Sequence, residues 1–153
     1  MSSLIPLVET FVSLQGEGPS AGEPALFVRL GNCNLNCVWC DTRHSWDWET
    51  FDKSEEIKAV SAEQLVTRVR RDLPDRVRLL VLTGGEPLLH QAAADALLAD
   101  LRDTRPDVRV EVETNGTIAP TRAWRDLVHL FVVSPKLANR SEERRVGKEC
   151  RSR

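Results

Sequence analysis

The segment Gly31-Asn-Cys-Asn-Leu-Asn-Cys-Val-Trp-Cys-Asp-Thr42 decides the fold class that this chain is expected to adopt. Its cysteines, Cys33, Cys37 and Cys40, are spaced CxxxCxxC and directly follow an apolar run at Ala25–Leu30. Thiolates are soft ligands that suit iron–sulfur clusters or zinc. A closed structural zinc site takes four ligands, whereas three cysteines gather here. Three cysteines on a four-iron cluster leave one iron open, and an open metal position is a place for chemistry.

Two other interpretations of these cysteines stay open from the spacing alone. The first is a zinc-binding module that takes Cys150 as its fourth ligand, and the second is three reduced, buried thiols. The zinc interpretation predicts stoichiometric zinc and its loss in Cys150→Ala. The iron–sulfur interpretation predicts indifference to Cys150→Ala and loss of the cluster in Cys37→Ala.

Size and composition favour one domain, with a cytoplasmic protein as the default expectation. The chain has 153 residues and a formal net charge of -2, which argues against broad nucleic-acid or membrane-surface binding. It has no apolar run of transmembrane length and no basic-then-apolar signal pattern at its start. Clustered thiols fit a reducing compartment better than a disulfide framework.

Apolar and amphipathic segments alternate along the chain and predict an α/β fold with a parallel sheet. Ser61 is expected to cap the first helix, with Gln64 at the capping-box position. Polar Trp46–Ala59 is expected to be an irregular insert, in which Trp46 and Trp48 either pack over the cysteine loop or anchor the insert. Strands are predicted at Leu26–Leu30, Val77–Leu82, Val108–Glu113 and Leu130–Val133, and helices at Ser61–Arg71, Gln91–Asp103 and Thr121–Val128.

Unusual motifs follow each predicted strand at its carboxyl end, where active sites of parallel sheets gather. They are the cysteine loop, Thr83-Gly-Gly-Glu-Pro87, Glu113-Thr-Asn-Gly116 and Ser134-Pro-Lys136. The paired glycines allow a close backbone approach to a ligand, and the Glu86 carboxylate suits an ammonium group. An ordinary strand-to-helix turn is the alternative. Near the N-terminus, Glu9–Gly18 by itself indicates a glycine-rich loop.

Taken together, these motifs resemble the 7-carboxy-7-deazaguanine synthase family of the radical S-adenosylmethionine (SAM) superfamily, which serves deazapurine and queuosine biosynthesis. The resemblance runs over roughly residues 5–138, through ExFxSLQGEG, FVRLGxC, CxWCDT, TGGEP, ETNGT and SPK. It implies a partial radical SAM (β/α) barrel with parallel strands, truncated from a β6/α3-type core. A glycyl-radical-enzyme activase shares the cysteine spacing, but SLQGEG and CDT are not expected there.

The resemblance also implies a reaction. Cys33, Cys37 and Cys40 would hold a [4Fe-4S] cluster, with SAM on the open iron. Reductive cleavage of SAM would give a 5′-deoxyadenosyl radical, which takes a hydrogen from 6-carboxy-5,6,7,8-tetrahydropterin. Ring contraction with loss of ammonia would yield 7-carboxy-7-deazaguanine, making the family carbon–nitrogen lyases. An electron donor such as flavodoxin and a homodimeric parent protein are implied as partners.

Site residues carry over by position within the matching motifs. Thr42 matches a Mg²⁺ ligand, in keeping with the preference of magnesium for oxygen donors. Glu113 and Asn115 are expected near the site without an assigned role, and the three histidines have no motif support. Substrate contacts are implied for Leu14, Gln15, Gly16, Arg29 and Thr83, and SAM contacts for Trp39, Cys40, Asp41, Gly85, Ser134, Pro135 and Lys136.

The character of the chain changes at its end. Residues 140–153 are polar and strongly basic, and they resemble the translation of a sequencing adapter more than a folded segment. We therefore expect a radical SAM core over residues 1–139 and a non-native, disordered tail over 140–153, with Cys150 excluded as a ligand. The strand at Leu130–Val133 would then be an exposed sheet edge.

Overall fold

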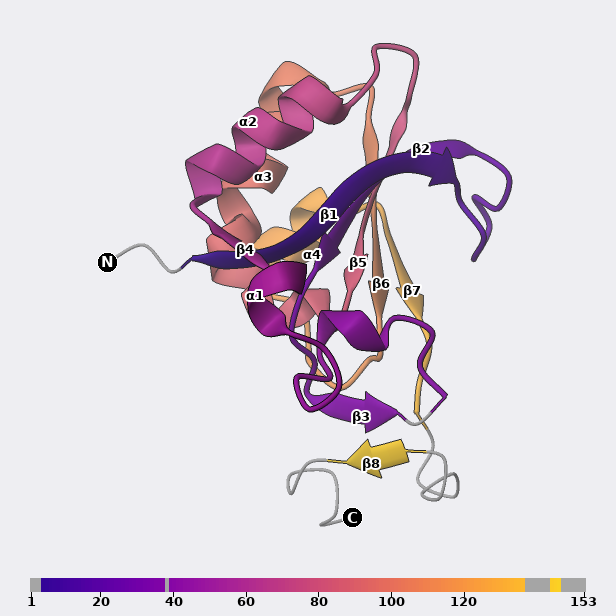
Figure 1. The fold of residues 1–153 in the computed structure, drawn as a ribbon. Coiled ribbons are helices and arrows are strands. Elements are labelled where there is room, and N and C mark those ends of the chain that lie inside the picture. Colours follow the sequence, from indigo (N-terminus) through magenta and orange to yellow (C-terminus); the bar gives the residue numbers. More distant parts are fainter. Residues whose placement is uncertain (1–3, 38, 137–143, 147–153) are drawn as a thin grey trace.

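The computed structural model describes residues 4–37, 39–136 and 144–146, the last of these as backbone only. A six-stranded sheet has the order β4-β1-β2-β5-β6-β7, and β3 pairs with β8 in a separate ladder (Figure 1). The strands are β1 (Ile5–Leu14), β2 (Pro24–Leu30), β3 (Leu35–Cys37), β4 (Lys58–Val60), β5 (Leu79–Gly84), β6 (Arg109–Thr114), β7 (Leu130–Val133) and β8 (Arg144–Val146). The helices are η1 (Arg43–Ser45), α1 (Lys53–Glu56), α2 (Ala62–Asp72), η2 (Pro87–His90), α3 (Gln91–Thr104) and α4 (Arg122–Leu127).

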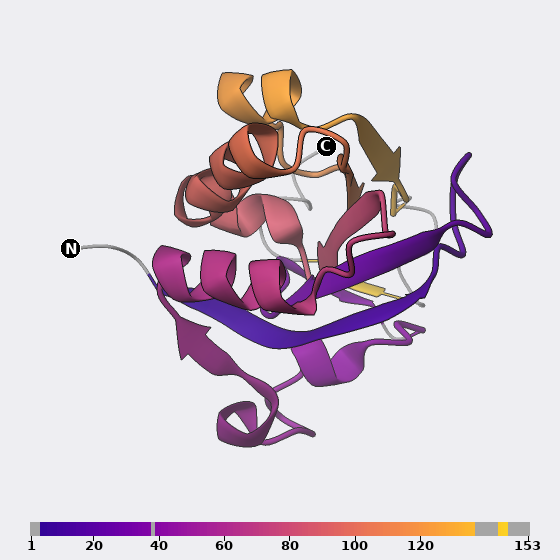
Figure 2. The ribbon, with the colours of Figure 1, turned by 90° about the horizontal axis from the view of Figure 1, so that it is seen from above.

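The four strands β2, β5, β6 and β7 run parallel, as the alternation of segments predicted. The helices α2, α3 and α4 cover one face of the sheet, seen edge-on in Figure 2. Because side chains alternate along a strand, Leu26, Val28 and Leu30 pack beneath these helices. Phe27 and Val81 point to the opposite face with a smaller apolar cluster. The end of that opposite face carries the polar site.

The helices α2 and α4 begin where the sequence predicted, because a side-chain cap marks the start of each. Ser61 caps α2 and forms a reciprocal capping box with Gln64. Thr121 caps α4 with its side chain alone, which accepts a hydrogen bond from the Trp124 amide. No helix within the described ranges combines the length and the apolar character that a membrane span requires.

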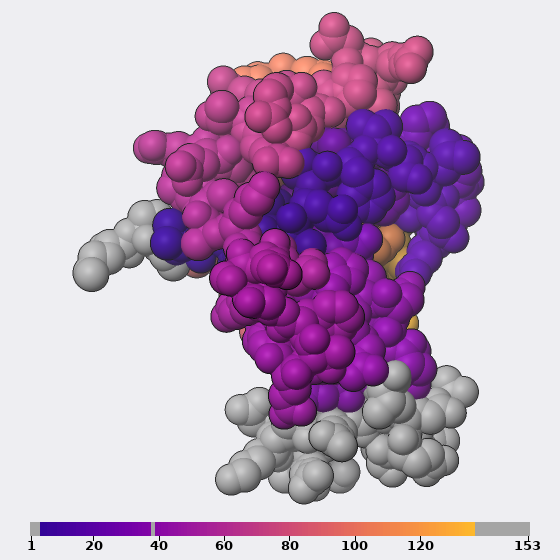
Figure 3. Space-filling view, in the orientation of Figure 1, coloured from indigo at the N-terminus to yellow at the C-terminus, as the bar shows by residue number. Residues whose placement is uncertain are grey.

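Three elements differ from the predictions. Glu9–Leu14 belongs to the long strand β1 rather than to a loop; it pairs antiparallel with β2, and the rings of Phe11 and Phe27 stack 5.0 Å apart. The insert expected to be irregular contains α1 and β4, and β4 pairs with the start of β1. These elements depend on partners distant in sequence, which a local pattern does not reveal. In Figure 3, β1 crosses the surface between α2 and the segment holding η1 and α1.

The end of the chain is described in part. Arg144–Val146 forms β8, whose backbone pairs antiparallel with β3 inside the segment expected to be a tail. The remainder of that segment, including Cys150, lies outside the described residues, so the boundary at residue 139 stays a prediction. In the sheet order, β7 is an edge strand.

A charged cluster joins α2 to the exposed side of β1. The Thr10 hydroxyl donates to the Asp72 carboxylate, and Arg68 Nε lies 3.1 Å from the same carboxylate. The hydrogen bond from Arg71 is the main cause that lowers the pKa of Asp72 to about 2; burial opposes it, and Thr10 and Arg68 add to it. This carboxylate therefore stabilises the fold in its ionised form.

We expect Asp72→Asn to destabilise the protein by about 1 kcal/mol at pH 7, the exposed side of the cluster being screened by solvent. Because the folded pKa lies below the unfolded one, the contribution is present above pH 4 and is lost as the pH falls toward 2. Urea unfolding at pH 7 and pH 3 measures the difference between the two proteins. Asp103→Asn, in an exposed pair with Arg102, is the control and should change little. A difference that is equal at both pH values would contradict this role.

Candidate functional site

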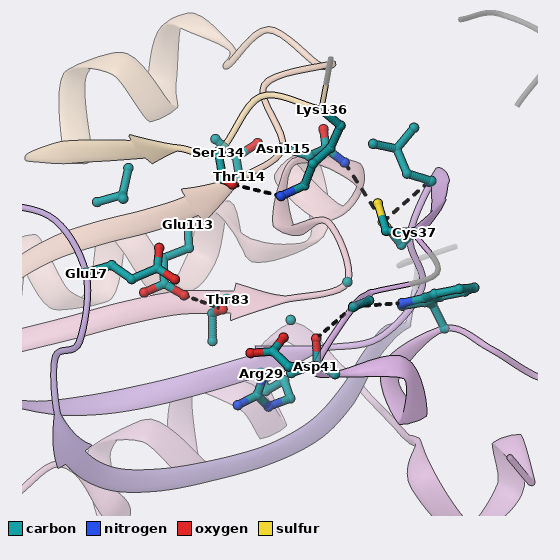
Figure 4. A pocket seen from close by; sticks show the side chains of 18 of the residues that line it. Glu17, Arg29, Cys37, Asp41, Thr83, Glu113, Thr114, Asn115, Ser134 and Lys136 are labelled. Carbon is teal, nitrogen blue, oxygen red and sulfur yellow. Dashed lines mark hydrogen bonds between the residues drawn. The ribbon is translucent and has the colours of Figure 1, made fainter. Parts of the chain in front are cut away.

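A cavity of about 410 Å³ lies at the carboxyl ends of the parallel strands (Figure 4). Most residues predicted for the site line its wall, although the sequence placed them in four separate motifs. Leu14, Gln15, Gly16 and Pro135 do not line it, so their predicted contacts stay predictions. The predicted residues in the wall are Arg29, Cys33, Cys37, Trp39, Cys40, Asp41, Thr42, Thr83, Gly85, Ser134 and Lys136.

Cys33 lies on the loop that follows β2, Cys37 ends the short strand β3 and Cys40 lies just beyond it, and none is in a disulfide. Their sulfurs sit among hydrogen-bond donors. The Leu35 amide nitrogen lies 3.4 Å from Cys33 Sγ, and the indole nitrogen of Trp46 lies 3.3 Å from Cys40 Sγ. Burial is the main cause that raises the pKa of Cys33 to about 11, opposed by the Leu35 amide. In the metal-free protein this thiol is therefore protonated at neutral pH.

This donor set fits an iron–sulfur cluster. Three thiols, of which Cys33 and Cys40 have N–H donors to their sulfurs, form the kind of environment in which such clusters are held and tuned. The thiolates of one zinc ion, by contrast, would lie about 4 Å apart, since the Zn–S distance is about 2.3 Å. Among the residues that the structure describes, no three His, Cys, Asp or Glu side chains gather around a single-ion position. The zinc interpretation also needs Cys150, which lies outside those residues.

The paired glycines hold the cysteine loop against the end of β5. The Gly85 amide donates to the Leu30 carbonyl over 2.9 Å, and the Glu86 amide donates to the Asn32 carbonyl over 2.9 Å. A Cβ on Gly84 would lie 1.9 Å from the Leu30 carbonyl oxygen, and Gly84 has φ = 129°. The glycines thus permit a close approach of backbone to backbone, where the sequence suggested an approach to a ligand.

Glu86 is a structural carboxylate in this fold. It is fully buried, and its oxygens accept hydrogen bonds from the Leu88 amide, the Thr114 hydroxyl and the Asn115 amide at 2.8–3.0 Å. It does not line the cavity. The suggested contact with an ammonium group is thus replaced by a connection between β5 and the end of β6.

Gly84→Ala should destabilise the protein by about 3 kcal/mol or more. The added methyl group collides with the Leu30 backbone, and the positive φ is strained for any L side chain. Urea unfolding measures the loss. Gly16→Ala is the matched control because a Cβ there meets nothing within 4 Å. Equal stability of the two variants would show that the Gly84 contact is not needed.

A polar row crosses the sheet just beneath the loops. Arg29 on β2 is the register partner of Thr83 on β5, and the Thr83 hydroxyl donates to the Glu113 carboxylate over 2.6 Å. Arg29 is itself held by an ion pair of 2.9 Å with Glu9 on β1. The row thus presents a guanidinium, a hydroxyl and a carboxylate on one floor of the cavity (Figure 4).

Lys136 lies at the opposite wall. Its Nζ lies 4.5 Å from the centre of the Trp39 ring and donates to the Ser134 hydroxyl over 2.7 Å. The contact joins the end of β7 to the cysteine loop. It brings together three residues that the sequence assigned to SAM.

Glu17 is a wall residue that received no role from the sequence, although it stands in the quoted QGEG motif. Burial, with the negative charges of Glu113 and Asp41, raises the pKa of its carboxyl, and Lys136 opposes the rise. Figure 4 shows the side chains of Glu17 and Glu113 next to each other. The cavity wall therefore holds three carboxylates, those of Glu17, Asp41 and Glu113, near one another.

Asn115, which had no assigned role, ties the end of β6 to the cysteine loop. Its amide nitrogen donates to Asn34 over 2.9 Å and lies 3.9 Å from Cys33 Sγ. The Asn115 side-chain oxygen accepts from Thr117. Only the turn signal of ETNGT was visible in the sequence.

The loop that carries Glu17 is held by hydrogen bonds to a buried carboxylate, that of Glu111. Ser20 donates its hydroxyl to Glu111, and the Gln15 amide nitrogen lies 3.4 Å from the other carboxylate oxygen. The Gln15 side-chain oxygen in turn accepts from the amides of Gly16 and Glu17. Gln15 thus orders the loop beside the cavity.

Glu111→Ala should loosen this loop while the sheet stays folded. The amides of Gln15, Gly22 and Glu23 are bonded within the loop, and we expect them to exchange with deuterium about tenfold faster, since buried hydrogen bonds are each worth about 1–3 kcal/mol. Hydrogen exchange followed by mass spectrometry measures the change. Glu23→Gln, which removes an exposed ion pair with Arg109, serves as the control. Unchanged exchange rates of these amides in Glu111→Ala would show that Glu111 does not order the loop.

Comparison with known proteins gives one consistent result. The model of the Radical SAM superfamily matches residues 28–149. The chain is 41% identical over 140 residues to a 7-carboxy-7-deazaguanine synthase of Hyperthermus butylicus, covering 89% of this chain and 54% of that protein. It is 42% identical over 137 residues to the synthase of Halobacterium salinarum, covering 88% and 47%.

A solved structure agrees with these sequence relatives. The crystal structure of QueE from Escherichia coli superposes with a TM-score of 0.67 at 33% identity, covering 88% of this chain and 61% of that one. The chain spans about half the length of the curated relatives it matches.

Proposed function

Because the chain belongs to the radical SAM superfamily, we propose that it supplies the active site of a 7-carboxy-7-deazaguanine synthase. The reaction is the radical ring contraction of 6-carboxy-5,6,7,8-tetrahydropterin to 7-carboxy-7-deazaguanine with loss of ammonia. The observation that carries the proposal is the single cavity that unites CxxxCxxC, the Gly-Gly turn, the Arg29–Thr83–Glu113 row and Ser134–Lys136. The curated relatives named for this activity support it.

Cys33, Cys37 and Cys40 would hold a [4Fe-4S] cluster. When bound, the cluster and the SAM on its open iron supply the one-electron chemistry that generates a 5′-deoxyadenosyl radical. The chain fixes the loop from below through Gly85, and from the side through Asn115. It thereby presents its sulfurs toward the cavity before any ligand binds.

SAM would lie against the wall built from the cysteine loop and β7. Trp39 offers an aromatic face, Lys136 a cation and Ser134 a hydroxyl, held together by the contacts described above. Asp41 and Gly85 line the same wall, and Pro135 separates Ser134 from Lys136. These groups suit a ligand that carries an amino-acid end and a ribose.

The pterin would lie over the polar row. The Arg29 guanidinium, whose side chain is 16% exposed beneath the cavity, suits the carboxylate of the substrate in fork geometry. The Thr83 hydroxyl and the neighbouring carboxylates suit the N–H groups of the ring. Thr42, whose Oγ1 lies 3.5 Å from Cys40 Sγ, would give an oxygen to Mg²⁺ together with that substrate carboxylate. Leu14, Gln15 and Gly16 would contact the substrate from the loop.

The surroundings of the reaction follow from the same proposal. A small electron donor such as flavodoxin would reduce the protein in the cytoplasm, and the parent protein would be a homodimer. Residues 1–139 would carry the radical SAM core. The chain would use no nucleic acid and no membrane.

Anaerobic reconstitution of the full chain with iron and sulfide tests the proposal. We expect an electron paramagnetic resonance signal of a reduced [4Fe-4S] cluster that shifts on addition of SAM. Cys37→Ala should abolish it because one of three ligands is lost, whereas Cys150→Ala should leave it unchanged. Stoichiometric zinc without iron would overturn the radical assignment.

Turnover with the carboxytetrahydropterin and SAM tests the specific reaction. The expected products are 7-carboxy-7-deazaguanine and ammonia, identified by mass spectrometry. A SAM-responsive cluster with no such product, in the presence of activity on another substrate, would instead indicate a different radical SAM enzyme such as a glycyl-radical-enzyme activase.

A further inference from the structure

The indole of Trp46 lies beside one of the three thiols. Its Nε1–H donates to Cys40 Sγ over 3.3 Å, and Trp46 is partly buried in the wall of the cavity. The sequence left open whether this tryptophan packs over the cysteine loop or only anchors the insert. The hydrogen bond shows that it reaches the sulfur itself.

The backbone that carries the indole is fixed in a turn. The Trp46 amide donates to the Arg43 carbonyl over 3.0 Å, and the Asp47 amide donates to the same carbonyl over 2.8 Å. The side chains of Arg43 and Asp47 form an ion pair across this turn. A donor that extends from a fixed backbone loses less freedom when it bonds to a sulfur than one on a loose segment.

The turn is also fastened to the cysteine loop. The buried Ser45 donates its hydroxyl to the Thr42 carbonyl over 2.7 Å, and the Ser45 carbonyl accepts from the Asn32 amide over 2.7 Å. Thr42 lies two residues after Cys40, and Asn32 immediately precedes Cys33. The turn of Trp46 therefore spans the cysteine loop from one end to the other.

A hydrogen bond to a thiolate sulfur has a definite electronic effect. Reduction adds negative charge to a cluster and its thiolates, and an N–H donor stabilises the more negative state more strongly. Such donors raise the reduction potential. A hydrogen bond to a charged group is worth enough to shift a one-electron equilibrium by about tenfold.

We propose that Trp46 is a positioning residue whose indole N–H tunes the reduction potential of the cluster through Cys40. The inference rests on the proposed function, because it requires a cluster on Cys33, Cys37 and Cys40. It adds to that function a group that eases electron entry at the Cys40 side. Trp46 itself contacts Cys40, which would bind the cluster, and does not contact the reacting atoms.

Trp46→Phe removes the N–H and keeps an aromatic ring. The full chain, reconstituted anaerobically, is titrated with a reductant of known potential while the reduced cluster is followed by electron paramagnetic resonance. We expect the variant to keep its iron and to be about tenfold harder to reduce, a shift of ~59 mV to lower potential for a one-electron couple. Trp48→Phe is the matched control: Trp48 does not line the cavity and contacts Lys53 instead.

Trp46→Gln tests rescue, because the glutamine amide carries N–H donors at the same number of bonds from Cβ as the indole nitrogen. Its potential should return toward that of the wild type. Iron retained in Trp46→Gln but lost in Trp46→Phe would support the donor role as well. An unchanged potential in Trp46→Phe, or loss of iron from both variants, would overturn it and leave Trp46 as a packing residue.

The two proposals fail in different ways. A wild-type chain that assembles no cluster refutes the proposed function and this inference together. A wild-type cluster that responds to SAM, with the same potential in Trp46→Phe, refutes the tuning role alone.

Discussion

The close contact between the backbone at Gly84–Gly85 and the backbone at Leu30–Asn32 is the constraint on which the site depends. It joins the ends of two parallel strands at a separation that a single Cβ would prevent. The cysteine loop starts from this contact, and Glu86 extends it to β6 through Thr114 and Asn115. The ends of β2, β5 and β6 are thus held together by the protein itself, which is the preorganisation that a reactive site needs.

One face of the sheet contributes most of the apolar core, and the other face carries the polar cavity. One face is sealed by α2, α3 and α4 over a continuous apolar core, and α2 is tied to β1 by the Asp72 cluster. The other face is apolar only around Phe27 and Val81 and becomes polar at Arg29, Thr83 and Glu113. Substitutions on the polar row should therefore alter binding more than folding.

Much of the fold could be predicted from local patterns, and the exceptions have physical causes. Apolar runs identified β2 and β5–β7, and the Ser61 cap identified the start of α2, because these signals lie within a few residues. The strand β1 was not predicted because it is stabilised by pairing with β2. The sequence suggested that Glu86 binds an ammonium group, because its neighbours in the motif are site residues. In the structure its carboxylate is buried and accepts three hydrogen bonds from the protein. The indole contact to Cys40 depends on a turn that no motif marks.

The strand β6 carries Glu111 and Glu113 on the same face, two positions apart. Glu111 holds the loop of Gln15 and Glu17 through hydrogen bonds, and Glu113 belongs to the polar row on the cavity floor. Two residues of a strand advance by about 6.6–6.8 Å, a length set by covalent geometry. The backbone of β6 therefore fixes the spacing, measured along the sheet, between the carboxylate that holds the Gln15–Glu17 loop and the carboxylate on the cavity floor, and no change of side-chain rotamer alters that backbone spacing.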